Sequence, residues 1–323
     1  MPDTPALQQA FPQPPGQQPG CGFPVVRLVV LFCWVTGAVT QVALGNLHTA
    51  EVALFRKNWD EWLAPGDVVL ADRHYCSYVD LVRLLQRGVF GVFRLHQRRP
   101  ADFRRGQRLG RDDQLVTWSR PASWIPSCGI SRGAFEQLPE TLTVRQLRIT
   151  QVPQGFRSRT ILVVTTLLDP QVYPAAELGA LYRDRWTAEL NLRSLKTHLG
   201  MEMLRGETPD VVRKEIGLHL LAYNLIRLLM WQAARAYGRD LHRLSFTGTL
   251  HRLRSVLPWV FLGSAGRPAA TLRVCLLHWI AQDELPDRPN RWEPRRRKRR
   301  PKTYSLLQKP RRWYRQHGDP HAR

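Results

Sequence analysis

Hydrophobic and polar positions follow two different periods along this chain. Residues 68–71 (VVLA) form a short continuous apolar run, which is typical of a central strand covered on both faces of a sheet. Residues 141–150 (TLTVRQLRIT) alternate with a period of two, which predicts another strand. Residues 49–64 instead repeat their apolar side chains at helical spacing, at Val52, Phe55, Trp59 and Leu63.

The segments that follow the run at 68–71 extend this pattern. Residues 77–87 predict a helix capped by its first residue, Ser77, and residues 91–95 predict the next strand. Strand, helix and strand therefore succeed one another within about 30 residues. This order favours an α/β core.

The rest of the chain divides into further strands and helices. Two β-like runs within residues 25–45 meet at Thr36-Gly37 and predict a buried hairpin. Residues 96–160 are Arg-rich and polar with several Gly and Pro breakers, so we interpret them as a mostly β insertion that returns to the core near residues 161–168. Further helices are predicted at residues 175–198, at 209–236 with Thr208 as cap and Pro209 in the first position, and at 268–281.

Charge points to a polyanionic partner. The 323 residues carry a formal net charge of +22, and nucleic acid is the first choice of partner for such a protein. Residues 291–315 alone hold twelve Lys or Arg and one Asp or Glu, so they supply +11 of this total. A solvated charge run is the alternative interpretation of this tail, to be weighed against contact with phosphates.

Cysteines and apolar runs bear on location. The five cysteines are odd in number and form no C-x-x-C, so a disulfide framework or a zinc site is not expected and a reduced, cytoplasmic setting fits. The longest apolar run, residues 28–39, is too short to span a bilayer. We therefore expect no membrane partner.

One stretch of the predicted helix at 175–198 gathers candidate chemistry. Tyr182, Arg185, Glu189 and Lys196 follow one another at steps of three, four and seven, which places them within about 60° around an ideal helix. A solvated face with an Arg185–Glu189 pair is the simplest interpretation. Against it, apolar residues flank this strip and suggest a helix buried on most sides. They are Trp186, Leu190, Leu192, Leu195 and Leu199.

Two acidic residues are candidates for metal-dependent chemistry. Asp72 ends the predicted strand at 68–71, and Glu189 lies on the charged strip. Carboxylates that converge on Mg²⁺ or Mn²⁺ can support in-line attack on a phosphodiester. Spacing alone leaves this open, since Asp72 could equally cap the element that follows it.

These residues resemble the insertion-sequence DDE transposases whose signature is Y-x₂-R-x₃-E-x₆-K. Tyr182, Arg185, Glu189 and Lys196 match that signature, and GDVVLADRHYCSY (66–78) is similar to the segment that carries the group's second aspartate. The resemblance covers about residues 1–310. It implies an α/β, ribonuclease-H-like fold, with a mixed sheet flanked by helices and a β-rich insertion between the second Asp and the Glu.

The resemblance also implies roles for individual residues. Asp72 and Glu189 would be catalytic ligands of Mg²⁺ or Mn²⁺, and Tyr182, Arg185 and Lys196 would contact DNA phosphates near the cleaved end. Trp186 could pack in the core or contact a splayed base. The implied segments are a first part of the catalytic core (1–95), the insertion (96–160), the remaining core with C-terminal helices (161–285) and a basic, disordered tail (286–323).

The family's first aspartate has no clear counterpart in this sequence. It belongs to an opening strand that would precede Met1, and the nearest acid, Asp3, lies in a Pro-rich loop. We therefore expect a chain that is truncated before the first catalytic Asp and impaired in strand transfer. An in-frame D-G-T segment upstream of the start codon would favour a complete enzyme.

The function predicted from these features is DNA transposition. A water molecule would attack at the element end, and the freed 3′-OH would then attack target DNA. The expected partners are element ends, target DNA and a second copy of the chain on DNA, in association with the bacterial nucleoid. Two alternatives stay open: a transposase remnant that only binds DNA, and a stand-alone nuclease of the same fold.

Overall fold

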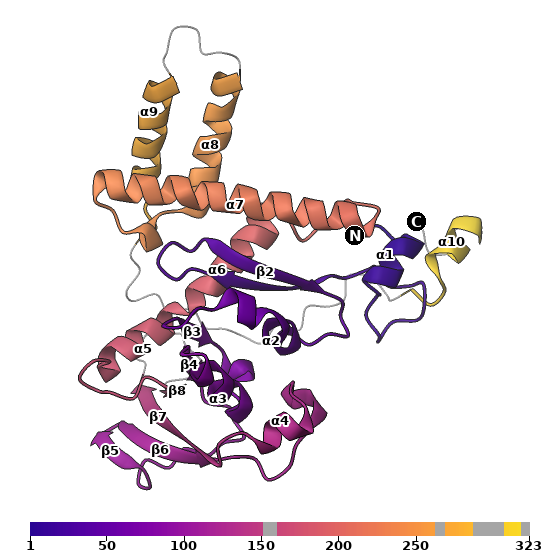
Figure 1. Cartoon of the computed structure of the whole chain (residues 1–323). Helices are drawn as coiled ribbons and strands as arrows, with labels where there is room; N and C mark the ends of the chain where they lie inside the picture. Colours follow the sequence, from indigo (N-terminus) through magenta and orange to yellow (C-terminus); the bar gives the residue numbers. More distant parts are fainter. Residues whose placement is uncertain (151–159, 262–268, 287–306, 318–323) are drawn as a thin grey trace. The chain divides into compact units, whose positions relative to one another are not determined.

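The computed structural model describes residues 1–150, 160–261, 269–286 and 307–317 (Figure 1). The chain forms two compact units. We call residues 51–187 the sheet unit, and we call residues 1–50, 188–286 and 307–317 the helical unit. The placement of the two units relative to one another is not determined, so each is described by itself.

The described part of the sheet unit is built on a six-stranded mixed sheet in the order β3-β4-β8-β7-β6-β5. β3 and β4 are parallel, and the other neighbouring pairs are antiparallel. The strands are β3 (Val68–Ala71), β4 (Phe90–Arg94), β5 (Gln107–Gly110), β6 (Asp113–Ser119), β7 (Thr141–Thr150) and β8 (Thr160–Thr165).

Helices pack against this sheet. The α-helices of the unit include α2 (Glu51–Trp62), α3 (Tyr78–Gln86), α4 (Arg132–Glu136) and α5 (Ala175–Asp184), with short 3₁₀ turns η1 (Arg73–Tyr75) and η2 (Pro126–Cys128). Val92 of β4, Leu147 of β7 and Val163 of β8 form a buried cluster with Leu178 and Tyr182 of α5. A mixed sheet flanked by helices confirms the α/β, ribonuclease-H-like fold class.

The expected strand at 68–71 exists, but its predicted central position is wrong. In the sheet that the described residues form, β3 lies at an edge and pairs with β4 alone. Val68 is 43% exposed, whereas Val69 is buried. Four apolar residues in a row are too few to distinguish an edge strand from a central one.

The predicted insertion contributes strands to this same sheet. β5, β6 and β7 extend it beyond β8, and β7 spans the alternating residues 141–150 as expected. A charge pair anchors the junction. Arg145 of β7 is fully buried and bonds the carboxylate of Asp113 on β6, with Nε to Oδ1 at 2.8 Å.

The predicted hairpin forms, in the helical unit. β1 (Arg27–Phe32) pairs antiparallel with β2 (Val39–Gly45), and Gly37 has a φ of +65° in the turn. Apolar side chains of one face pack on the cluster that holds Ile216 and Tyr223. Most strand residues are only half-buried, so the expectation of a buried hairpin is wrong in degree.

Helices make up the rest of the helical unit. The long α7 (Pro209–Tyr237) begins as predicted, with Thr208 accepting a hydrogen bond from the Val211 amide. The others include α1 (Pro5–Ala10), α8 (Phe246–Phe261), α9 (Ala269–Gln282), α10 (Arg311–His317) and the turn η4 (Leu241–Arg243). In the described part of the chain, no helix has both the length and the hydropathy that crossing a membrane requires.

The described piece of the basic tail folds against the N-terminal loop. Arg311 of α10 bonds Asp3 with Nη1 to Oδ2 at 3.0 Å, and Gln8 donates to the other oxygen of Asp3 at 2.7 Å. Both carboxylate oxygens of Asp3, the acid nearest to the expected first aspartate, thus accept hydrogen bonds from neighbouring side chains. Most of the run at 291–315 lies outside the described residues.

Candidate active site

Asp72 stands directly after β3, at the carboxyl end of the parallel β3–β4 pair. Its Oδ1 accepts a hydrogen bond from the His74 amide at 2.7 Å and caps η1. The capping role considered from the sequence is therefore real. The side chain is 47% exposed, and among the described residues none donates a hydrogen bond to its Oδ2. The capped geometry fixes the carboxylate while one oxygen stays open to a ligand.

Tyr182 lies within electrostatic reach of Asp72 in the same unit. Burial raises the pKa of the Tyr182 hydroxyl, Arg185 and Arg94 oppose this rise, and the charge of Asp72 adds to it. A hydrogen bond from Arg185 also acts on the hydroxyl, and the Arg185 guanidinium carbon lies 5.9 Å from the ring centre. Within the sheet unit, Tyr182 thus senses the charge of Asp72 and contacts Arg185.

The predicted helix at 175–198 is not continuous. α5 ends at Asp184, Arg185 forms its C-cap, and the chain continues as α6 (Trp186–Arg193) and a π-helical turn, η3 (Ser194–His198). The unit boundary also falls within this stretch, after residue 187. Angles read from one ideal helix therefore do not hold here. Tyr182 is 5% exposed, whereas Glu189 and Lys196 are exposed residues of the helical unit.

The apolar flank of α6 is also more exposed than the sequence suggests. Trp186 is 43% exposed and Leu190 45%, while Leu195 is fully buried. The expectation of a helix buried on most sides is wrong for α6, because its apolar residues do not all point to one core. This exposure does not fit packing of Trp186 in the core, and its contact with a base stays a prediction.

Asp72 and Glu189 have the type of ligand atom that a divalent cation needs. Carboxylate oxygens are hard ligands suited to Mg²⁺ or Mn²⁺, and Asp72 has an oxygen available. Among the residues that the structure describes, no group of three or more His, Cys, Asp or Glu is placed to hold a metal ion. Whether Asp72 and Glu189 share a cation stays a prediction, since they belong to different units.

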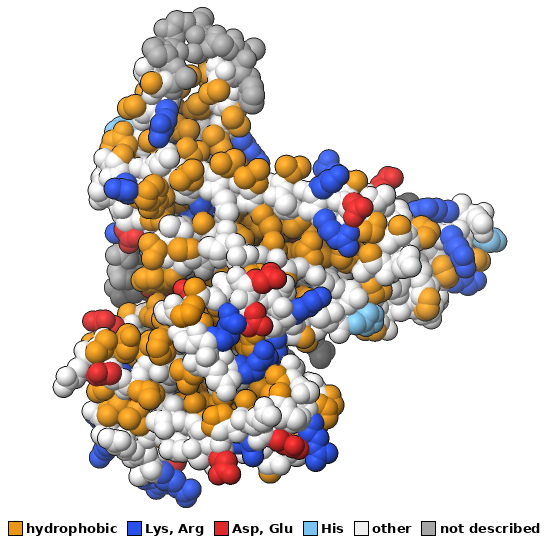
Figure 2. Space-filling model, viewed as in Figure 1, with side chains coloured by type: hydrophobic (Ala, Val, Ile, Leu, Met, Phe, Trp, Pro, Cys, Tyr) orange, Lys and Arg blue, Asp and Glu red, His pale blue; other side chains and the backbone are white. Residues whose placement is uncertain are grey.

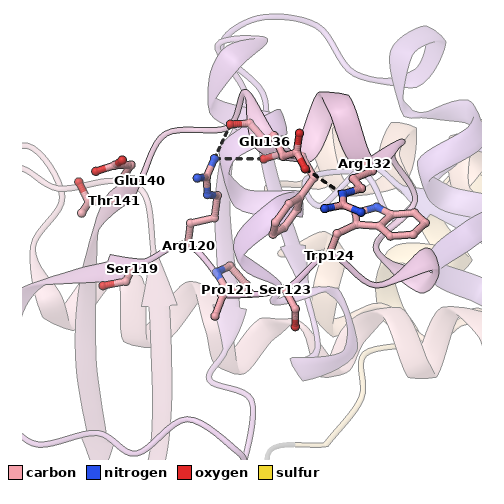
Figure 3. A pocket seen from close by; sticks show the side chains of 11 residues that line it. Ser119, Arg120, Pro121, Ser123, Trp124, Arg132, Glu136, Glu140 and Thr141 are labelled. Atoms are coloured by element: carbon pink, nitrogen blue, oxygen red, sulfur yellow. Dashed lines mark hydrogen bonds and ion pairs between the residues drawn. The ribbon is translucent and has the colours of Figure 1, made fainter.

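A cavity of about 670 Å³ opens in the insertion (Figure 3). Its arginines are already engaged: Arg120 donates to the carbonyl oxygens of Glu136 and Leu138, at 2.5 and 2.9 Å, and Arg132 pairs with the Glu136 carboxylate at 2.9 Å. Glu136 and Glu140 also line it. A polyanion gains little from such a lining.

A smaller cavity of about 360 Å³ in the sheet unit has the opposite character, and we call it the basic cavity. Arg73 and His74, the two residues that follow Asp72, form part of its wall. No acidic residue lines it within the described structure. Its basic side chains are those of Arg56, Arg73, His74, His96, Arg98 and Arg99.

Three arginines of the basic cavity have no acidic partner among the described residues, and one of them, Arg73, donates to the Gln97 amide oxygen at 2.7 Å. Arg98 is exposed, and the Arg99 guanidinium carbon lies 4.0 Å from the ring centre of Trp118. Burial lowers the pKa of Arg99, against the opposing influence of Cys76 and Tyr78. A partly desolvated cation without a carboxylate is stabilised when an anion enters.

A strand-end carboxylate stands next to a cavity whose wall, as far as the structure describes it, has arginines and no acid. This arrangement suits phosphodiester chemistry on nucleic acid. Comparison with known proteins agrees. Residues 4–225, more than half of the chain, match the family described as transposase DDE domain. The chain belongs to this family of transposases.

Two relatives illustrate the match. The transposase InsG for insertion sequence element IS4 of Escherichia coli (strain K12) is 27% identical over 311 residues, which cover 95% of this chain and 67% of that protein. The putative transposase y4zB of Sinorhizobium fredii (strain NBRC 101917 / NGR234) is 33% identical over 89 residues, which cover 28% of this chain and 24% of its own length.

Sequence reasoning did not single out Arg98 and Arg99 as functional residues. Each lies in the polar stretch after β4, where a run of basic residues alone cannot show which ones lack an acidic partner. The signal that could have found them is position. They follow β4, which is parallel to β3, so they lie at the same carboxyl end of this strand pair as Asp72.

Proposed function

We propose that the chain binds DNA through the basic cavity and, with a divalent cation, cleaves and joins strands at the ends of an insertion sequence. The observation that carries this proposal is the basic cavity, whose wall begins directly after Asp72 and contains no acid among the described residues. Membership of the transposase family supplies the reaction class.

Asp72 and Glu189 would hold the cation, preferably Mg²⁺ and alternatively Mn²⁺. A bound divalent cation supplies a Lewis acid for the attacking oxygen and for the leaving oxygen. Asp72 presents its Oδ2 while the His74 amide holds Oδ1. Glu189 is exposed on the first turn of α6, where a carboxylate is favourable near the helix N-terminus.

Cationic side chains would hold the DNA backbone around these acids. Arg98 and Arg99 would bind a phosphate in the basic cavity, and Arg185 and Lys196 would bind phosphates near the cleaved end. Tyr182 is largely buried, so it would reach a phosphate only through the hydroxyl that Arg185 contacts. Two copies on DNA would bring two element ends together.

Cleavage of element-end DNA tests the catalytic part. Using duplexes that carry the sequences flanking this gene, we expect Asp72→Asn and Glu189→Gln each to lower single-turnover cleavage with Mg²⁺ by a factor of about 1,000. DNA binding should stay within about twofold. Glu61→Gln and Glu202→Gln are matched controls, because both are exposed acids on the same two units. Equal activity of the paired variants and controls would refute the assignment.

The salt dependence of DNA binding tests the basic cavity. Replacing Arg98 and Arg99 by alanine should lower the slope of log K against log salt by about two, since each released phosphate contact changes it by about one. Arg132→Ala is the control, because that guanidinium is paired with Glu136. Alanine at Arg295–Arg300 should also flatten the slope if the tail contacts phosphates.

A DNA-binding protein without catalysis is the second candidate. The described residues hold no group of three metal-binding side chains, and two metal ions need more carboxylates than Asp72 and Glu189 supply. On this second candidate, the chain by itself would show little strand transfer. Salt-dependent binding with no cleavage in Mg²⁺ or Mn²⁺ would favour this candidate.

A further inference from the structure

The long helix α7 has two apolar faces. One packs into the helical unit through the buried residues Val212, Ile216, Leu220, Tyr223, Ile226 and Met230. On the other face Leu218, Leu221, Leu225 and Leu228 are 65, 55, 52 and 46% exposed. Figure 2 shows hydrophobic side chains at the surface of this unit, over α8 and α9 and beside α7. Four exposed leucines on one helix are an unfavourable surface for a chain in water.

The exposed leucines follow a strict spacing. Their steps are three, four and three residues, which is the alternation of the a and d positions of a heptad. Continuing the same steps reaches Val211, Lys214, Gln232 and Arg235, so the apolar row spans residues 218–228 and polar side chains follow it at both ends. A surface helix that only covers its own core needs one apolar stripe, and α7 already has one. The second row is the pattern of a helix that pairs with another helix.

We propose that this row, which we call the leucine row, pairs antiparallel with α7 of a second copy of the chain about a two-fold axis. In this register Leu221 faces Leu225 of the partner subunit, and Leu218 faces Leu228 of the partner subunit. The same patch is used on both copies, so the interface closes as a dimer and leaves no open end.

Charges at the ends of the row favour an antiparallel over a parallel pair of two copies. A parallel pair would place Lys214 against Lys214 of the partner subunit, and Arg235 against Arg235 of the partner subunit, which is unfavourable. The antiparallel pair places Lys214 opposite Gln232 of the partner subunit. It also brings Arg235 of the partner subunit beside Asp210, whose side chain is 84% exposed and already pairs with Arg213 of its own chain at 2.8 Å. The helix dipoles also attract in this direction.

This pairing does not depend on the transposase chemistry. It needs no DNA, no cation and neither of the acids Asp72 and Glu189. It names the surface by which two copies of the proposed transposase would meet, but the test below can fail or succeed whatever the outcome of cleavage assays. Failure of the pairing and failure of the proposed function are therefore distinguishable.

Light scattering of the full chain without DNA tests the pairing. We expect the mass of two chains at about 10 µM, and the mass of one chain for the variant L221E/L225E, with a dissociation constant at least about 100-fold higher. Val172→Glu is the control, because Val172 is 61% exposed but lies in the sheet unit. Circular dichroism checks that each variant is folded. A monomeric wild type, or a dimer that survives L221E/L225E, overturns the proposal.

Crosslinking between two variants that each carry one added cysteine on α7 tests the direction. In a background with Cys33 and Cys275 replaced by serine, L221C and L225C are oxidised separately and as a mixture. The antiparallel pair predicts a disulfide-linked dimer that is several-fold more abundant in the mixture than in either variant alone. A crosslink of L221C with itself at full yield would contradict the antiparallel register and support a parallel pair.

Discussion

The two units bury an arginine in different ways. In the sheet unit Arg145 is fully buried and bonds both oxygens of Asp113, while its Nη1 donates to the Tyr173 carbonyl at 2.7 Å. In the helical unit Arg227 is 6% exposed and its Nε donates to the Thr36 carbonyl at 2.8 Å. One guanidinium is neutralised by a carboxylate, and the other is held by the backbone of a hairpin turn.

The sheet unit therefore depends on a buried ion pair, whereas the helical unit depends on hydrogen bonds to a hairpin turn. Burial lowers the pKa of Arg227, so its charge is held at some cost in the helical unit. The contact nevertheless joins α7 to the hairpin, since Tyr223 of the same helix also donates to the Gly37 carbonyl at 2.7 Å. In the sheet unit the insertion strand β7 is tied to β6 by its ion pair.

Removing the carboxylate should have the largest effect. Asp113→Ala leaves the fully buried Arg145 without a counter-charge, so we expect the free energy of unfolding of the sheet unit to fall by about 3–5 kcal/mol. Arg227→Met should cost less, about 1–3 kcal/mol, because it removes the charge and leaves only a carbonyl unpaired. Urea unfolding with hydrogen exchange assigns each loss to its unit. The double variant D113L/R145M should recover part of the loss, and equal costs for the two single variants would contradict the comparison.

Alkaline pH should weaken the sheet unit next. Burial raises the pKa of the Cys76 thiol and of the Tyr75 hydroxyl to about 12 each, from ordinary values of 9.0 and 10.0, and Glu51 and Asp72 add to the rise at Tyr75. Because both pKa values are higher in the folded protein than in the unfolded chain, the protonated groups stabilise the folded state. This contribution to stability is full below pH 9 and is lost as pH rises toward 12. We expect the folding equilibrium constant to fall about tenfold per pH unit for each titrating group.

The variant Cys76→Ala separates the two contributions. It should remove the part of the alkaline loss that begins near pH 9 and leave the part that begins near pH 10. The measurement is urea unfolding at several pH values between about 8 and 11, which bracket the onset of both titrations. An unchanged slope in this variant would show that the thiol is not protected in the folded protein.

The hairpin turn gives a smaller and more local effect. Gly37→Ala should destabilise the helical unit by about 1–2 kcal/mol, because φ is +65° and an added Cβ would lie 2.5 Å from Nη2 of Arg227. Gly133→Ala is the matched control. Gly133 lies within α4, and no atom lies within 4 Å of the position that an added Cβ would take, so its replacement should stabilise by about 0.5–1 kcal/mol. Thermal unfolding distinguishes the opposite signs.

Helix caps should give the smallest effects, similar in the two units. Ser77→Ala removes the hydrogen bond to the Asp80 amide in α3, and Thr208→Ala removes the one to the Val211 amide in α7. We expect each to cost about 1 kcal/mol, with faster hydrogen exchange in the first turn of its own helix. Exchange that rises in the other unit instead would mean that the units unfold together.

Local pattern predicted the elements whose signals agree with one another. α7 carries a cap, a proline at its first position and a regular apolar period, and β7 alternates over its whole length. α8 was missed, since Pro258 and Gly248 weaken its signal. The edge position of β3 also could not be derived, because it depends on pairings made far away in the sequence.

The candidate site was predictable in its parts and not in its assembly. Asp72 lies at a strand end as expected, because a short apolar run and its end are local features. The break at Arg185 and the π-helical turn after it change the geometry that equal steps along a helix would give. The residues that line the basic cavity come from several segments between Arg56 and Phe135, so no single stretch of sequence contains it.

The central claim is that Asp72 and Glu189 bind the same divalent cation. Fe²⁺ can replace Mg²⁺ at such sites, and with ascorbate and peroxide it cuts the backbone close to where it binds. We predict cuts beside both residues, suppressed by excess Mg²⁺, with both cuts lost in Asp72→Asn and both lost in Glu189→Gln. A cut beside Glu189 that persists in Asp72→Asn, or a cut beside only one of the two, would contradict the claim.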